Sequence, residues 1–143
     1  MRFMMLMIPK GYETAAPDAL PDAAAVSAMM KYNESLQEAG VLLALDGLHP
    51  PSSGVRVSYS GGKRVVTDGP FAETNEVVGG YWLIQVKSKA EAVEWACRCP
   101  CSDNGVIEVR QVQEFSEFPT ELQKAAAGFA EMQKEIGQKK SAQ

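Results

Sequence analysis

The sequence predicts an α+β fold, in which one antiparallel sheet carries helices on one of its faces. Two patterns predict it: a strand–helix–strand order that occurs twice, and a hairpin pattern between the two occurrences. The length of 143 residues suits one such domain. Hydrophobic residues make up 45% of the chain, which is enough to form a sizeable core.

The first strand–helix–strand unit begins at the N-terminus. Arg2–Ile8 (RFMMLMI) is apolar on both faces, which is typical of a central strand. Pro9–Pro21 is rich in Pro, Gly, Asp and Ala and predicts a loop. Val41–Leu48 predicts a second buried strand, which ends before the Pro and Ser residues that follow His49.

A helix lies between these two strands. Asp22 can cap its N-terminus, the helix runs to about Ala39, and Gly40 ends it. Its apolar positions follow helical spacing, interrupted by Asn33. These positions are Val26, Met29, Met30 and Leu36.

A hairpin follows the first unit. Val55–Tyr59 alternates apolar and polar residues, as a half-buried strand does. Ser60–Gly62 is a turn signal, and Lys63–Thr67 returns as the partner strand.

The second unit begins with a strand at Gly80–Val86. Ser88 and Glu91 stand three residues apart and form a capping-box pattern at the start of a helix, which Pro100 ends. The last strand is Val106–Val112. The predicted buried stripe of the helix consists of Ala92, Trp95, Ala96 and Cys99.

The C-terminal part predicts one further helix over Pro119–Ile136, with a frayed tail at Gln138–Gln143. An apolar stripe runs along this helix, and we expect it to pad a dimer. We therefore divide the chain into a domain at residues 1–115 and a helical extension at 116–143. The stripe consists of Leu122, Ala125, Phe129, Met132 and Ile136.

Two split βαβ units indicate a ferredoxin-like βαββαβ sandwich with an inserted hairpin and a C-terminal helix. Helices cover one face of such a sheet, so the other face needs a different cover. A second copy of the chain is the simplest cover, and we expect a homodimer through the open sheet face.

Strand alternation predicts which polar residues share that open face. In the last strand Glu108 and Arg110 lie on one side, opposite the apolar pair Ile107 and Val109. In the preceding strand the face with Tyr81 and Gln85 is the more polar one. The alternative interpretation is a solvated or interface face with no chemistry.

The loop Asp68–Val78 combines turn signals, carboxylates and an aromatic residue. Phe71 is an apolar anchor in a polar stretch, and Glu73 and Glu76 stand three residues apart. A loop of this length and composition is typical of a binding or catalytic loop. The alternative is a tight turn with an anchored Phe71 and solvated acids.

The segments DGPFAETNE, GGYWLIQV, EAVEWACRCP and IEVRQV resemble the DGPF branch of the YCII-related proteins, over Phe3 to about Val112. The resemblance implies a dimeric α/β barrel, formed by two ferredoxin-like sheets packed face to face, with a cleft beside the DGPF loop. Members of the wider superfamily resemble muconolactone-type isomerases and dehalogenating lyases, which use no cofactor. Many DGPF proteins are thought to accompany alternative sigma factors, so the resemblance also implies a protein partner of that kind.

The chain departs from the family pattern at two positions. Asn75 stands where the family has Lys, which puts a shared charge network in doubt. Smaller YCII proteins carry a His on the first helix, paired with an Asp as an acid–base dyad. That His would fall near Met29, so the dyad does not carry over.

If the cleft carries out acid–base chemistry, the candidate bases are Asp68 and Glu73, and His49 is the candidate acid. Tyr81 could orient a substrate oxygen, and Arg110 or Arg98 could hold a carboxylate. Phe71 and Glu108 complete the set of candidate substrate-binding residues. Alternatively, His49 is a surface turn residue and Arg98 interacts with a helix end.

Composition excludes several classes of partner. The net charge of −4 disfavours nucleic acid and anionic membranes, and no apolar run is long enough to span a bilayer. Cys97, Cys99 and Cys101 lack a second ligand pair, so we expect reduced structural thiols, no metal, no cofactor and a cytoplasmic location. Two functions remain: binding or conversion of a small organic molecule, and a non-catalytic regulatory interaction.

Overall fold

The computed structural model describes residues 1–72 and 76–142. The chain divides into two compact units, Met1–Gln111 and Val112–Gln143. The first unit contains a four-stranded antiparallel sheet in the order β2-β5-β1-β6. Its strands are β1 (Arg2–Ile8), β2 (Leu42–Gly47), β5 (Gly80–Gln85) and β6 (Val106–Gln111).

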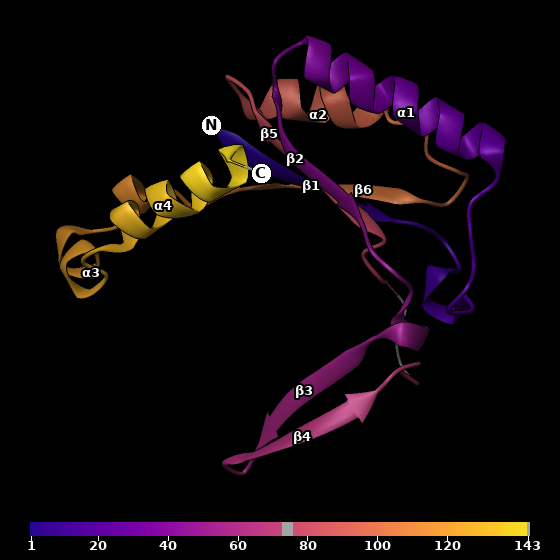
Figure 1. Ribbon diagram of the computed structural model, residues 1–143, viewed down its shortest axis with the longest axis horizontal. Helices are drawn as coiled ribbons and strands as arrows, with labels where there is room; N and C mark the ends of the chain where they lie inside the picture. Colours follow the sequence, from indigo (N-terminus) through magenta and orange to yellow (C-terminus); the bar gives the residue numbers. More distant parts are fainter. Residues whose placement is uncertain (73–75, 143) are drawn as a thin grey trace. The chain divides into compact units, whose positions relative to one another are not determined.

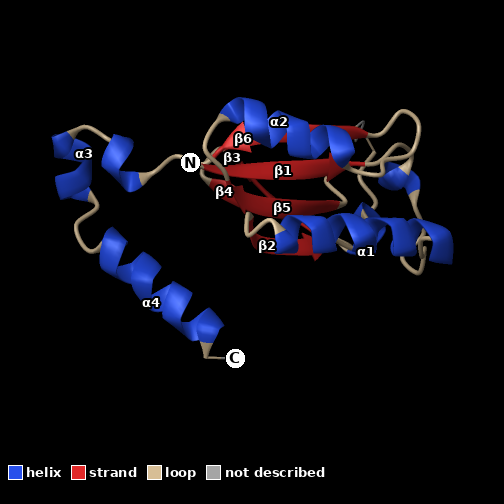
Figure 2. Cartoon of the chain, turned by 90° about the horizontal axis from the view of Figure 1, so that it is seen from above, coloured by secondary structure: helices blue, strands red, loops and turns tan. Residues whose placement is uncertain are grey.

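Two helices, α1 (Ala23–Glu38) and α2 (Lys89–Arg98), lie on the same face of this sheet (Figures 1 and 2). The strand order and the two split βαβ units confirm the predicted α+β ferredoxin-like fold. Both predicted caps are present. Asp22 Oδ1 accepts a hydrogen bond from the Ala25 amide at 2.8 Å, and Ser88 Oγ accepts one from the Glu91 amide at 3.2 Å.

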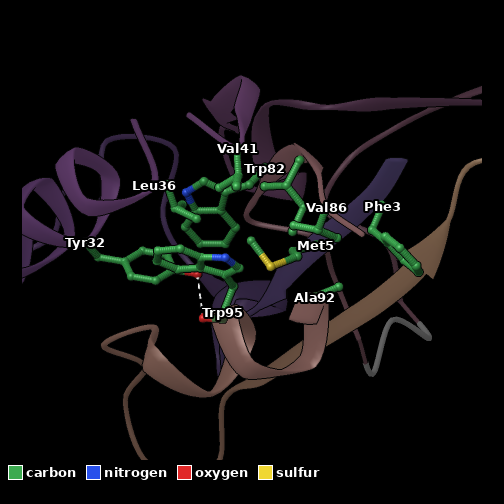
Figure 3. Packing of buried hydrophobic residues seen from close by; sticks show 10 residues of the cluster. Phe3, Met5, Tyr32, Leu36, Val41, Trp82, Val86, Ala92 and Trp95 are labelled. Carbon is green, nitrogen blue, oxygen red and sulfur yellow. Dashed lines mark hydrogen bonds between the residues drawn. The ribbon is translucent and has the colours of Figure 1, made fainter. Parts of the chain in front are cut away.

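The core lies between the sheet and the two helices (Figure 3). At its centre the Tyr32 ring of α1 meets Trp82 of β5 edge-on at 5.6 Å. The buried Tyr32 hydroxyl donates a hydrogen bond to the Trp95 carbonyl of α2 at 2.8 Å, which joins the two helices. The buried core residues are Phe3, Met5, Tyr32, Leu36, Val41, Trp82, Ile84, Val86, Ala92 and Trp95.

The strand register places alternate residues on the other face of the sheet, which we call the open face. Asp46, Tyr81, Leu6 and Glu108 form one row across β2, β5, β1 and β6. Arg110 lies one row further along, opposite Met4. The shared face of Tyr81, Glu108 and Arg110 agrees with the alternation of the sequence.

The predicted hairpin forms a separate two-stranded sheet of β3 (Val55–Ser60) and β4 (Lys63–Asp68). We call residues 55–68 the arm. Gly61 and Gly62 form its turn with φ of 55° and 76°, a region that favours glycine. The arm extends away from the four-stranded sheet (Figure 1), and every residue of both strands is exposed.

The prediction of one continuous helix over Pro119–Ile136 is wrong. The second unit instead contains α3 (Thr120–Ala125) and α4 (Phe129–Ser141). They are separated at Gly128, which adopts a left-handed φ of 91° that a helix interior does not allow. The last helix also continues through Gln138, where we expected the chain to fray.

Three short 3-10 helices complete the described chain: η1 (Tyr12–Thr14), η2 (Pro51–Ser53) and η3 (Phe115–Glu117). In η3, the Glu117 carboxylate accepts a hydrogen bond from the Glu114 amide at 2.8 Å. Phe115 also packs its ring 5.6 Å from that of Phe129. Among the helices of residues 1–72 and 76–142, none combines the length and apolar character needed to cross a bilayer.

Candidate functional site

A cavity of about 490 Å³ lies between the first half of α1 and the neighbouring ends of β1, β2 and β5. This volume is within the range of small-molecule sites, about 300–1,000 Å³. The cavity wall is mainly apolar. Its principal apolar side chains are Met7, Val26, Met29, Met30, Leu45 and Trp82.

The cavity exists because the fully buried side chains of α1 all lie in its second half. Tyr32 and Leu36 are buried, whereas Val26 and Met30 are 51% and 54% exposed. The apolar spacing that predicted this helix therefore continues into a part of α1 that the core does not cover. An apolar helix face that lines a cavity is typical of a ligand site.

Asn33 supplies a polar group in the cavity wall. Its Oδ1 accepts a hydrogen bond from the Trp82 indole nitrogen at 2.8 Å, which fixes the orientation of the amide. In the described part of the chain, no acceptor takes the Nδ2 hydrogens of this residue. The Asn33 amide can therefore donate a hydrogen bond to a bound molecule.

Tyr81 and Asp46 form a hydrogen-bonded pair at the edge of the sheet. The two residues are opposite each other in the β2–β5 register, and the Tyr81 hydroxyl donates to Asp46 Oδ2 at 2.8 Å. The hydrogen bond to this carboxylate raises the pKa of Tyr81 above 10.0, with smaller contributions from desolvation and from the carboxylate charge. The phenol is the donor in this hydrogen bond.

Sequence reasoning identified Tyr81 but missed Asp46. The alternation of β2 could have indicated that Asp46 shares the face of Ala44, but its pairing with Tyr81 depends on a long-range register. Of the candidate substrate-binding residues, the structure brings Tyr81, Glu108 and Arg110 onto the open face.

The DGPF segment lies at the base of the arm. The Gly69 amide donates to the Gly54 carbonyl at 2.8 Å, and a Cβ on Gly69 would overlap the Pro51 carbonyl oxygen. The Gly69–Pro70 peptide is cis. The Arg56 guanidinium lies 4.0 Å from the centre of the Phe71 ring. These contacts fix the path of the chain where it leaves the arm.

The candidate acid–base residues lie apart from the cavity. Asp68 is the last residue of β4 and is exposed, and His49 is exposed after the end of β2. Neither lines the cavity described above. Glu73 lies outside the described residues. The structure therefore does not bring Asp68 and His49 to the cavity wall.

Arg98 has two contacts within its own helix. Its guanidinium lies 4.6 Å from the centre of the Trp95 ring and 3.3 Å from the Glu94 carboxylate. Both contacts join neighbouring turns of α2. They give Arg98 a role at the end of the helix that requires no ligand.

The three cysteines are free thiols in different environments. Cys97 is exposed, whereas burial and then the neighbouring Cys101 raise the pKa of Cys99 to about 12. Cys101 lines the cavity, with its Sγ 3.7 Å from Met7 Sδ. Within residues 1–72 and 76–142, no group of three His, Cys, Asp or Glu side chains could hold a metal ion.

Comparisons with known proteins identify the family of this chain. The family model of the YCII-related domain matches residues 1–116. An uncharacterised protein of Rhizobium meliloti (strain 1021) is 41% identical over 59 residues, which is 41% of this chain. The match spans about half of that relative, 48% of its length. Because the family model covers most of the sequence, the chain belongs to the YCII-related family.

Proposed function

We propose that this protein binds a small, mainly apolar organic molecule in the cavity beside α1. The observation that carries the proposal is the 490 Å³ cavity, with an apolar wall and one oriented amide donor. Methionine side chains in the wall adapt to ligands of different shape, because their unbranched thioethers have several accessible rotamers.

The charges of the wall narrow the class of ligand. Asp46 is the only residue with a formal charge among the described residues that line the cavity. No cation is therefore available there to bind a carboxylate. The Asn33 Nδ2 hydrogens suit a neutral acceptor. A ketone, ester or lactone with an alkyl or aromatic body meets both requirements.

Binding without turnover fits this cavity better than acid–base catalysis. Met29 lines the wall at the position near which the family resemblance places a His. A thioether cannot transfer a proton at neutral pH. Asp68 and His49 lie outside the wall. Proton transfer by the predicted residues Asp68, Glu73 and His49 stays a prediction.

Calorimetric titration and thermal unfolding with an alkyl lactone test the proposal. We expect the lactone to raise the melting temperature, because a ligand at about 100 times its Kd stabilises the folded state by about 2.7 kcal/mol. The matching open-chain hydroxy acid should bind at least tenfold more weakly. Met29→Trp should abolish binding by filling the cavity, whereas Val93→Trp, on the exposed side of α2, should leave it unchanged.

A second variant tests the amide. Asn33→Asp keeps an oxygen acceptor for the Trp82 indole but removes the Nδ2 donor. We expect at least a tenfold loss of lactone affinity, because the variant removes one hydrogen bond and places a carboxylate beside the carbonyl oxygen of the lactone. Failure of every neutral carbonyl compound to bind, or full binding by Met29→Trp, contradicts the proposal.

A non-catalytic interaction is a second candidate, favoured by the open face. Met4, Leu6 and Leu83 are partly exposed there and form an apolar centre between polar residues. Apolar surface of this kind is typical of association. We propose that two copies of the chain pair through this face. A sigma factor as partner and a cytoplasmic location stay predictions.

A further inference from the structure

The arm has one apolar face and one polar face. The β3–β4 register places Val55, Val57, Tyr59 and Val66 on the same side, which also carries the charged residues Arg64 and Asp68. The opposite side carries mainly polar residues, among them Arg56, Ser58 and Thr67. Because the side chains of a strand alternate, this arrangement is the pattern of a hairpin that covers an apolar surface with one face.

Within the unit Met1–Gln111, no described residue covers that apolar face. The exposed fractions are 57% for Val55, 49% for Val57, 76% for Tyr59 and 67% for Val66. An isolated two-stranded hairpin is marginally stable in water and gains stability by packing. The arm nevertheless pairs six residues of each strand in regular register. These properties indicate that the apolar face of the arm packs against a surface outside the contacts described above.

We propose that the arm docks with its apolar face on a second copy of this chain and receives the arm of that copy in return. This exchange of arms goes beyond the pairing of open sheet faces proposed above, and it rests on that pairing. In a twofold dimer every patch that a copy offers is also one that it receives. One arrangement would therefore cover both unpartnered apolar surfaces, the arm and the open face.

Length and charge both suit a second copy. Each arm strand has six residues, about 20 Å at 3.3 Å per residue, whereas a four-stranded sheet is about 14 Å wide between its outer strands. The arm can therefore reach across a partner sheet. It carries three basic residues and one acidic residue, a net charge of +2, in a chain of net charge −4. Arg56 and Lys63 lie on the polar face, and Arg64 and Asp68 balance each other on the apolar face. The charge therefore gives a long-range attraction between the basic arm and the remainder, at −6, rather than charged contacts on the docking face.

Sedimentation over a range of concentrations tests the exchange. We expect the wild-type chain to be a dimer at micromolar concentration. Val57→Glu combined with Val66→Glu should raise the dissociation constant at least 100-fold. The matched control is Ser58→Glu combined with Thr67→Glu, which adds two carboxylates to the polar face and should change the constant less than threefold. All four positions are exposed, so circular dichroism should show an unchanged fold.

The outcomes distinguish the pairing of open sheet faces from the exchange of arms. A wild-type monomer would overturn both the pairing and the exchange. A dimer that the Val57/Val66 double variant leaves intact, but that Leu83→Glu on the open face dissociates, would overturn the exchange alone. Hydrogen exchange gives a second readout: amides of residues 55–68 should become more protected as protein concentration rises. Protection independent of concentration would indicate a cover within the chain and contradict the exchange.

Discussion

The two sheets of the protein contain similar strand residues, but these residues are buried in one sheet and exposed in the other. In the four-stranded sheet, Phe3, Met5 and Ile84 are almost fully buried. In the arm, alternating valines are equally well suited to a strand, yet they are all exposed. The difference shows that alternation identifies the face that needs a cover, whereas the cover itself is a property of the fold or of the assembly.

The largest expected difference between the sheets is in core stability. Ile84→Ala removes a side chain with no exposure and should lower the free energy of unfolding by about 2–5 kcal/mol. Val65→Ala, on the polar face of the arm, should change it by less than about 0.5 kcal/mol. Denaturation by urea measures both values. Similar losses for the two variants would contradict the contrast drawn between the sheets.

A single methyl group added at the junction between the two sheets should lower the stability of the protein. Gly69→Ala places a Cβ on the Pro51 carbonyl, a backbone group that cannot move aside cheaply, so we expect a loss of about 2–4 kcal/mol. Gly47→Ala is the control, because nothing lies within 4 Å of its Cβ position. Thermal unfolding compares the two variants, and equal melting temperatures would show that the junction tolerates displacement.

The smallest effect concerns the pH behaviour of the open face. Tyr81 has a raised pKa because it donates to Asp46, so Asp46→Asn should lower that pKa toward 10.0. A folded-state pKa above the unfolded value means that the stabilisation is complete below about pH 10. It is lost as the pH rises through the folded-state pKa. Tyrosinate absorbance follows this titration, with Tyr81→Phe identifying the contribution of that ring. An unchanged titration in Asp46→Asn would rule out the pair.

Most of the fold follows from local signals in the sequence. The apolar segment Arg2–Ile8 became a central strand, and the caps at Asp22 and Ser88 began the two helices. The C-terminal helix was mispredicted because its apolar spacing continues across Gly128. A glycine in an alanine-rich segment does not reveal from sequence alone whether it will adopt a left-handed conformation.

The candidate site was less predictable than the fold. Strand alternation correctly placed Tyr81, Glu108 and Arg110 on one face. The cavity was missed, because apolar positions such as Val26 and Met29 have the same spacing whether they face a core or line a hollow. The roles of the candidate residues still depend on ligands and partners that the local sequence pattern does not specify.

A hydrogen bond from the Gly69 amide to the Gly54 carbonyl at 2.8 Å closes the base of the arm. The chain thus leaves the sheet domain and returns to it at almost the same point. An insertion whose two ends are adjacent can gain or lose cross-strand residue pairs while the scaffold on either side keeps its geometry. The length of the arm can therefore change separately from the volume of the cavity beside α1.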